Sequence, residues 1–339
     1  MKYVDYREFI EENFLIKNKE GEVVPFIFND TQIYYYNLLE KDYPDFQGIR
    51  ENDLKFRQPG FSSLIDGMFT VDFILAEMGE APITDSDIYS HKMDETKNLF
   101  DRVSDYYYES WISKAYSLDF FNNKSDIKKI RSQLLELDSG NKMKGKQGAL
   151  MNVQTASAKV SGRGGTKQNI HWSEIAFYPN TQIMSAENLV TAAEQQVKDG
   201  FGKIFRESTG NIAGDFFDTE FTKGEDGIGE YKSRFFGWWI HPEYVREAPI
   251  GWEIPEYYKN IVEKYNVTKN QCYWHFKKTN SLTDKKKIRE YPTTKHEAFL
   301  YGGEQYFSKE ALQHYAGTII KPIAEGVDFI RAYATIQNI

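Results

Sequence analysis

Strand-like and helix-like segments alternate along this chain of 339 residues, and the alternation constrains its fold more than any other feature. Short runs rich in apolar and β-branched residues predict strands at 150–155, 169–173, 203–207 and 234–240. Periodic segments predict helices at 31–41, 62–78, 94–113, 126–137 and 182–199. A strand, a helix and a second strand in succession place the two strands parallel in one sheet. The sequence therefore predicts an α/β fold whose mostly parallel sheet is flanked by helices.

The composition is that of a globular chain. Hydrophobic residues make up 40% and charged residues 27%, and the length suggests two units or one large α/β domain with an extension. The Gly-rich, acidic segment 221–233 is the best candidate for a flexible loop. The acidic N-terminus is no secretory signal, and no run of about 18 apolar residues predicts a transmembrane helix. Because Cys272 is the only cysteine, an intrachain disulfide and a thiolate metal cluster are excluded, and a reducing compartment is expected.

Charge is distributed unevenly. The net charge of -8 argues against a surface covered in DNA-binding charge. The segment 124–167 nevertheless holds ten basic residues and three acidic ones, and 269–289 holds seven basic residues and one acidic one. Either cluster can contact a phosphate backbone, and solvated surface helices explain each cluster as well. Within the first cluster, the candidate DNA-binding residues are Lys142, Lys144 and Lys146.

One loop and the helix after it match part of the P-loop pattern GxxxxGK[ST]. The loop has the sequence KFRQPGFSS over residues 55–63. Gly60 and Ser62 occupy the last Gly and the Ser/Thr positions, where helix N-terminal N–H groups bind phosphate and a hydroxyl binds Mg²⁺. Lys55 replaces the first Gly, and Phe61 replaces the Lys. An ordinary loop-to-helix turn explains the segment as well.

Two predicted strands end in polar residues. The strand 169–173 is followed by Glu174, in the place where P-loop ATPases keep the carboxylate that polarises the attacking water. Ser173 stands where an Asp usually holds the Mg²⁺ ion, and a capping or surface carboxylate explains Glu174 as well. The strand 203–207 ends in a polar run, Glu207, Ser208, Thr209, Gly210 and Asn211, at the strand end where α/β proteins bind ligands, or in a simple turn. His171 is expected to pack or cap beside the Glu174 segment.

In their order, these blocks resemble the large subunit of tailed-phage terminases, the motors that package DNA. The resemblance extends from about Phe26 to Phe307 and rests on PFIFN (25–29) with Gln32, KFRQPGFSS (55–63), SGRGGT (161–166), SEIA (173–176), STGN (208–211), and EYP (290–292) with EAF (297–299). It implies a P-loop NTPase fold of the additional-strand, catalytic-Glu, RecA-like type. It also implies an ATPase core over 1–250 and a small linker or lid-like extension over 251–339.

The resemblance implies roles for individual residues in binding ATP and Mg²⁺. Gln32 resembles the adenine-reading Gln of the family, and from the sequence alone it equally forms a capping box with Asn29. Ser62 is the implied Mg²⁺ ligand, and the other nucleotide-binding residues are Lys55, Arg57, Gln58, Gly60 and Ser63. Either Lys55 or Arg57 supplies the positive charge that the usual loop Lys provides and that Phe61 cannot, and the sequence does not rank them.

The remaining implied roles concern hydrolysis and coupling. Glu174 orients the water that attacks the γ-phosphate and reaches Mg²⁺ through water, with Arg57 as a further catalytic candidate. Arg163 is a candidate trans-acting arginine finger, or else a surface or DNA-contacting arginine. Ser208, Thr209 and Asn211 resemble the motif that couples the γ-phosphate to DNA grip.

The implied function is an ATPase that moves double-stranded DNA into a procapsid. Implied partners are the portal protein, the small terminase subunit and copies of the same chain in a ring, pentameric in the family, without a membrane. The implied location is the host cytoplasm at the portal vertex. The terminase nuclease domain is expected to be absent, because only 32 residues follow Phe307. The substitutions at Phe61 and Ser173 leave two alternatives open, a non-hydrolysing nucleotide- or DNA-binding packaging component built on the same fold and a helicase-like P-loop ATPase.

Overall fold

A computed structural model describes residues 5–156, 165–179, 185–282 and 289–299. The chain divides into two compact units, residues 1–302 and 303–339, and all described residues belong to the first unit. Within these residues, no helix combines the length and apolar character needed to cross a membrane. The division at residue 250 into an ATPase core and an extension remains a prediction.

One sheet of eight strands forms the centre of the first unit, in the order β10-β3-β9-β8-β4-β7-β6-β5. The strands from β10 to β7 are parallel, and their bounds are Lys232–Phe236 (β10), Arg50–Lys55 (β3), Lys203–Ser208 (β9), Asn169–Ser173 (β8), Asp85–Ser90 (β4) and Leu150–Thr155 (β7). The last two, β6 (Lys142–Gly145) and β5 (Leu135–Ser139), continue the sheet antiparallel. The predicted α/β fold with a mostly parallel sheet is confirmed. The strand β9 lies between β3 and β8, which is the arrangement that the additional-strand class describes.

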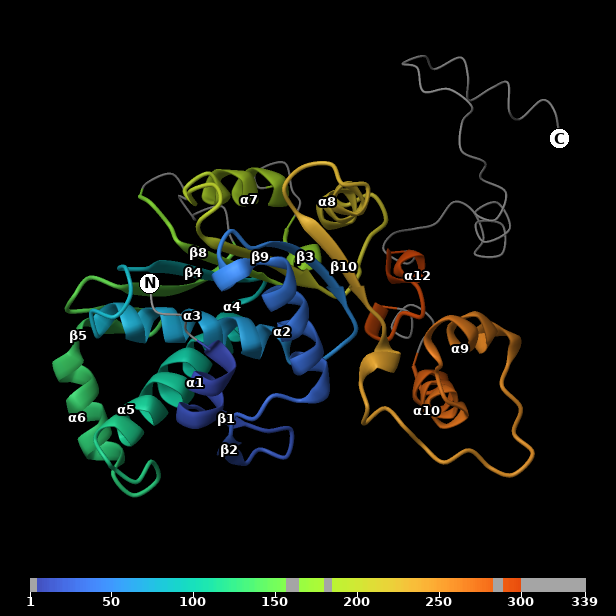
Figure 1. Ribbon diagram of the computed structural model, residues 1–339, viewed down its shortest axis with the longest axis horizontal. Helices are drawn as coiled ribbons and strands as arrows, with labels where there is room; N and C mark the ends of the chain where they lie inside the picture. Colours follow the sequence, from blue (N-terminus) through green and yellow to red (C-terminus); the bar gives the residue numbers. More distant parts are fainter. Residues whose placement is uncertain (1–4, 157–164, 180–184, 283–288, 300–339) are drawn as a thin grey trace, which may run out of the picture. The chain divides into compact units, whose positions relative to one another are not determined.

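Helices cover both faces of this sheet (Figure 1). One face packs on α1 (Tyr6–Asn13), α2 (Asp30–Asp42) and α3 (Phe61–Glu77), and the other packs on α7 (Ala186–Glu194) and α8 (Phe216–Glu225). The two faces correspond to two hydrophobic clusters, because side chains alternate along each strand. On β9, for example, Phe205 packs near Phe69 of α3, whereas Ile204 belongs to the cluster on the α7 and α8 side. The helix α3 is buried on all sides over most of its length, as its apolar sequence requires.

The other elements lie around this three-layer arrangement. Two short strands, β1 (Leu15–Lys17) and β2 (Val23–Pro25), form an antiparallel ribbon. The remaining helices are α4 (Met93–Asp101), α5 (Glu109–Ala115), α6 (Lys124–Leu134), α9 (Lys259–Tyr265), α10 (Lys269–Asn280) and α12 (Lys295–Phe299). A π-helical segment, η2 (Arg102–Tyr108), joins α4 to α5. Short 3-10 turns are η1 (Pro44–Phe46), η3 (Ile175–Phe177), η4 (Trp238–Ile240) and η5 (Glu256–Tyr258).

Most predicted elements are confirmed, and the exceptions have local causes. The predicted strand 234–240 ends at Phe236, because Trp238 turns into η4 and buries its indole. The helix predicted at 126–137 ends at Leu134, where the chain enters β5. The helix predicted at 182–199 is observed over Ala186–Glu194, and 180–184 lies outside the described residues. The predicted flexible loop 221–233 is wrong at both ends, since 221–225 is the end of α8 and Lys232 and Ser233 begin β10.

Candidate active site

A cavity of about 950 Å³ opens at the carboxyl ends of four neighbouring parallel strands. Each strand contributes a side chain at or just after its last residue: Lys55 from β3, Thr209 from β9, Glu174 from β8 and His91 from β4. This edge of an open parallel sheet is where α/β proteins bind ligands. The loop from Arg57 to Gly60 and the first residues of α3 form another wall of the same cavity.

The loop between β3 and α3 presents an open helix N-terminus to the cavity. Gln58 and Gly60 adopt positive φ angles of 60° and 89°. Asn29 and Gln32 hold the loop by hydrogen bonds to the carbonyl groups of Pro59 and Gly60, at 3.4 and 2.8 Å. Among the described residues, no side chain caps the N-terminus of α3. The first-turn N–H groups of this 17-residue helix therefore remain suited to an anion such as a phosphate.

Lys55 is a buried basic residue among those that line the cavity. Its Nζ lies 2.9 Å from Glu174 Oε1 and 2.9 Å from Glu207 Oε2, and its side chain is 5% exposed. Burial alone lowers the pKa of Lys55, but the two carboxylates outweigh burial and raise it, so the ammonium stays charged. Arg57 is 55% exposed and forms an ion pair with Glu290 at 2.7 Å. Phe61, at the usual Lys position, is buried and stacks on Tyr35.

Glu174 is held in one orientation at the cavity wall. The backbone of Glu174 has a φ of 54°, a left-handed conformation that costs energy in a residue other than glycine. Its Oε2 accepts hydrogen bonds from the Thr209 N–H and the Ser208 hydroxyl, both at 3.2 Å, while Oε1 contacts Lys55. The side chain is 29% exposed, so the fixed carboxylate is still accessible from the cavity.

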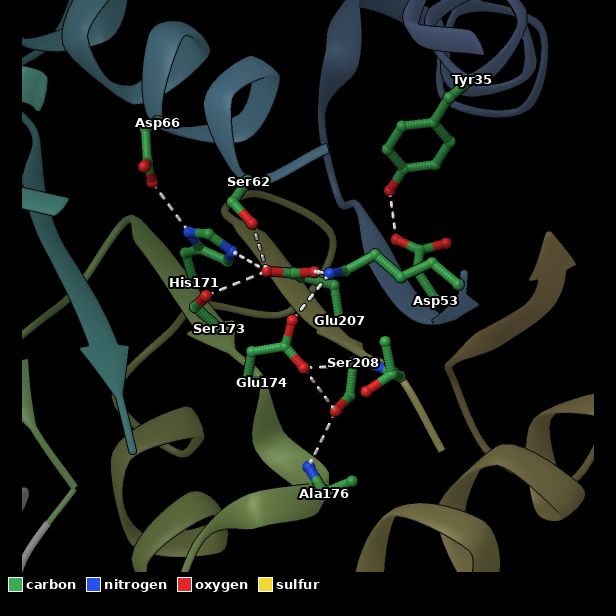
Figure 2. Close-up of polar contacts among 12 residues, drawn as sticks. Tyr35, Asp53, Ser62, Asp66, His171, Ser173, Glu174, Ala176, Glu207 and Ser208 are labelled. Atoms are coloured by element: carbon green, nitrogen blue, oxygen red, sulfur yellow. Dashed lines mark hydrogen bonds and ion pairs between the residues drawn. The ribbon is translucent and has the colours of Figure 1, made fainter. Parts of the chain in front are cut away.

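Six side chains of alternating charge form a continuous chain of contacts at the cavity. Its members, in order, are Arg102, Asp66, His171, Glu207, Lys55 and Glu174, and the five contacts measure 2.8, 2.8, 3.3, 2.9 and 2.9 Å. Figure 2 shows the central part, where His171 lies between Asp66 and Glu207. Burial lowers the pKa of His171, but the carboxylates of Asp66 and Glu207 outweigh it and raise the pKa to about 9. His171 is thus an ionic link rather than the simple packing or capping residue that the sequence predicts.

The predicted coupling residues lie against the segment that follows Glu174. The Ser208 hydroxyl accepts a hydrogen bond from the Ala176 N–H at 3.3 Å and donates to Glu174 (Figure 2). Asn211 donates from its side-chain amide to the Ala176 carbonyl at 2.9 Å. These contacts join the loop after β9 to Glu174 and Ala176, and the coupling role of Ser208, Thr209 and Asn211 stays a prediction.

Gly210 provides a test of how tightly this loop packs. A Cβ at position 210 would lie 2.1 Å from the carbonyl oxygen of Ala298 in α12, a distance that requires the backbone to shift. We expect Gly210→Ala to lower the free energy of unfolding by about 1–3 kcal/mol, as overpacking does elsewhere. Urea unfolding measures the change. Gly140→Ala is the control, because nothing lies within 4 Å of a Cβ there, and equal effects of the two substitutions would contradict the packing.

Asp53 provides a second test, through pH. It is fully buried on β3 and accepts a hydrogen bond from the Tyr35 hydroxyl (Figure 2). Burial and the nearby Glu51 carboxylate raise the pKa of Asp53 well above its usual value. Above the unfolded-state pKa of about 3.9 and below the raised value, the folded chain binds one more proton than the unfolded chain, so the free energy of unfolding falls as pH rises.

Asp53→Asn should remove this fall. We expect the slope of the free energy of unfolding against pH to become less negative by up to about 1.4 kcal/mol per pH unit inside that window. Urea unfolding across the window measures the slope for the wild type, for Asp53→Asn and for the exposed-site control Asp226→Asn. Identical slopes in the wild type and Asp53→Asn would contradict the raised pKa.

The other predicted site residues are placed less centrally. Gln32 forms both bonds of the capping box with Asn29 and donates to Gly60, and its adenine-reading role stays a prediction. Arg163 lies outside the described residues. Gln58, Ser62 and Ser63 line the cavity.

The predicted DNA-binding lysines lie on and beside β6, at the antiparallel end of the sheet. Lys144 forms an ion pair with Glu136 at 2.7 Å. Elsewhere in the basic cluster 124–167, Arg131 contacts three carboxylates and Lys167 contacts two. Part of the positive charge counted in the sequence is therefore neutralised within the fold, and DNA contact by Lys142, Lys144 and Lys146 stays a prediction.

The sequence did not indicate several residues of the site. Glu207 begins the polar run 207–211 that the sequence indicates, but its own role was not predicted, because its contacts depend on strand order. His91, Arg102 and Arg289 line the cavity. His91 follows β4, whose sequence DSDIYS lacks an apolar pattern, and Arg102 begins a π-helical segment inside a predicted helix. His91 would have been identified if β4 had been predicted as a strand.

Comparisons with known proteins concern the fold. No family model and no curated protein sequence matches the chain. Among solved structures, the chain is similar to the large terminase ATPase domain of Thermus phage P74-26, at 14% identity and a TM-score of 0.40, over 71% of this chain and 86% of that one. It is also similar to the large terminase of another thermophilic bacteriophage, at 12% identity and a TM-score of 0.38, over 70% of this chain and 50% of that one. The chain therefore spans half the length of this second protein.

Proposed function

We propose that the chain binds Mg²⁺·ATP in the cavity at the end of β3 and hydrolyses the γ-phosphate bond. The observation that carries this proposal is the convergence of three features on one cavity: the uncapped N-terminus of α3, the Lys55 ammonium and the fixed Glu174 carboxylate. The helix N-terminus and the ammonium suit phosphate oxygens. The carboxylate is suited to orient an attacking water.

The residues present also fit a magnesium ion bound together with phosphates. Mg²⁺ usually takes one or two protein oxygens and completes its shell with water and phosphate. Ser62 offers its hydroxyl at the start of α3, beside the cavity. Within the described residues, no group of three or more His, Cys, Asp or Glu is arranged to hold a metal without such help. When bound, the ion would neutralise charge that develops on the phosphates.

We propose further that hydrolysis drives double-stranded DNA into a procapsid. The order of the sequence motifs, which resembles that of tailed-phage terminases, supports this assignment. In the proposed setting, a ring of chains contacts the portal protein and the small terminase subunit in the host cytoplasm. Arg163 then acts on the nucleotide of a neighbouring chain, and the basic cluster around Lys142, Lys144 and Lys146 contacts DNA.

Phosphate release from ATP tests the proposal on the full chain, with and without double-stranded DNA and Mg²⁺. We expect Mg²⁺-dependent turnover that rises more than linearly with protein concentration, because the proposed arginine acts between subunits. Binding of an ATP analogue without turnover at any concentration would instead indicate a non-hydrolysing packaging component. Strand separation on a forked duplex would indicate a helicase. Absence of nucleotide binding would exclude the motor and the helicase and leave only a DNA-binding packaging component.

A further inference from the structure

Glu207 lies where a P-loop ATPase needs a second carboxylate. In P-loop NTPases, the loop Ser/Thr and an Asp at the end of a neighbouring strand hold Mg²⁺ between them. In this chain the position before Glu174 is Ser173, which has no charge. The Ser62 hydroxyl donates instead to Glu207 Oε1, at 2.7 Å (Figure 2). The carboxylate paired with the loop hydroxyl therefore comes from β9 rather than from β8.

The register of the sheet explains how a carboxylate on β9 can stand in for one on β8. Ser173 and Glu207 are direct partners across the β8–β9 pair, so their side chains share one face at one level of the sheet. The Ser173 hydroxyl donates to Glu207 Oε1 at 3.0 Å. Adjacent strands lie about 4.8 Å apart, and the longer Glu side chain spans part of that distance. The carboxylate thus reaches the space between the two hydroxyls.

The partners of the Glu207 carboxylate connect it to the cavity. The side chain is 0% exposed, so its ionised form depends on the groups around it. Oε1 receives hydrogen bonds from Ser62 and Ser173 and contacts His171 Nε2 at 3.3 Å. Oε2 is buried and forms an ion pair with the Lys55 ammonium at 2.9 Å. Two of these four partners, Ser62 and Lys55, line the cavity.

We propose that Glu207, on β9, is the positioning carboxylate of the magnesium site. It takes the place of the Asp that is absent from position 173 on β8. It orients the Ser62 hydroxyl toward the ion and balances the charge of the bound metal beside Lys55. His171 contacts the Glu207 carboxylate through Nε2 and is itself held by Asp66 at Nδ1. This inference rests on the proposed function, since it assigns a residue to the metal that accompanies the nucleotide.

Nucleotide binding, rather than turnover, tests this role. The dissociation constant of a fluorescent ADP analogue is measured on the full chain in Mg²⁺ and in EDTA, and the ratio of the two values gives the tightening due to the metal. We expect Glu207→Gln to reduce this ratio by about 10–100-fold, as loss of an outer metal-shell partner does elsewhere. Glu207→Asp keeps the negative charge on a side chain that is one methylene shorter, and we expect a smaller reduction of the ratio.

A carboxylate transplant gives the sharpest comparison. In the double variant Ser173→Asp/Glu207→Ser, the acid returns to β8 at the same level of the sheet, and we expect the Mg²⁺ ratio to recover relative to Glu207→Ser alone. A residue that merely stabilises the fold would not give such a rescue. Glu194→Gln is the matched control, because Glu194 is only 11% exposed and is paired with Arg206 on the opposite face of the sheet. It should leave the ratio unchanged.

The outcomes separate this inference from the proposed function. If the wild type binds the analogue in neither buffer, the proposed function fails. If the wild type shows a Mg²⁺ ratio that Glu207→Gln and Glu207→Asp both preserve, the role of Glu207 is wrong while the nucleotide site stands. Circular dichroism of each variant checks that it is folded, and Glu207→Asp, which retains the buried charge, allows the comparison if Glu207→Gln unfolds.

Discussion

Glu174→Gln is expected to lower ATP turnover by about 10²–10⁴-fold, the usual contribution of a positioned acid-base group. The amide oxygen can still accept the hydrogen bonds from Ser208 and Thr209, so the local structure should persist. The substitution removes the charge that would polarise a water next to the γ-phosphate. Affinity for an ATP analogue should therefore stay within a few-fold of the wild type while phosphate release is lost.

Glu220→Gln is the matched control for this prediction. Glu220 is paired with Arg206 and is 21% exposed, close to the 29% of Glu174, but it belongs to α8 on the other face of the sheet. Its turnover should equal that of the wild type. Retention of full turnover in Glu174→Gln would remove Glu174 from the chemistry.

Lys55→Met is expected to abolish both nucleotide binding and turnover. The substitution removes the ammonium that lies between Glu174 and Glu207, and it leaves Glu207 buried with less compensation. Breaking a buried ion pair from one side costs about 3–5 kcal/mol, so the free energy of unfolding should fall by a comparable amount. Urea unfolding and titration with an ATP analogue measure the two effects.

Arg57→Ala separates the two cations that the sequence left unranked. Arg57 is 55% exposed in its pair with Glu290, and exposed pairs contribute about 0–1 kcal/mol. We expect a small change in stability and retained binding of the analogue. In the double variant Lys55→Met/Glu174→Gln, part of the lost stability should return, because one uncompensated carboxylate is gone. If Arg57→Ala abolished binding and Lys55→Met did not, the assignment of the cation would be reversed.

The strands that the sequence predicted well are those with an apolar pattern. The bounds of β7 and β8 match the predictions at 150–155 and 169–173, since buried apolar residues alternate along both strands, at Met151 and Val153 in β7 and at Ile170 and Trp172 in β8. The strand β3 was not predicted, although all six of its residues are buried. Five of them are polar or charged, and their partners lie far away in the sequence. Asp53 meets Tyr35, Asn52 meets Glu220, and Glu51 meets Arg234. No local pattern reveals such compensation.

The residues of the candidate site also fall into two groups, those that the sequence could identify and those that it could not. Ser62, Glu174 and Ser208 each belong to a short motif beside a predicted strand or helix, so the sequence alone could nominate them. The choice of Lys55 over Arg57 and the position of Glu207 depend on which strands are neighbours and in which register. Strand order and register arise from packing across the whole sheet, and the motif spacing does not contain them.

A crystal structure of the chain with Mg²⁺ and a non-hydrolysable ATP analogue tests the central claim most directly. The prediction is that the β- and γ-phosphates lie at the N-terminus of α3 within hydrogen-bond distance of Lys55. The metal should lie at Ser62, with the terminal phosphate facing Glu174. An analogue bound away from the loop between β3 and α3, or held there by Arg57 with Lys55 still paired to both carboxylates, would contradict it.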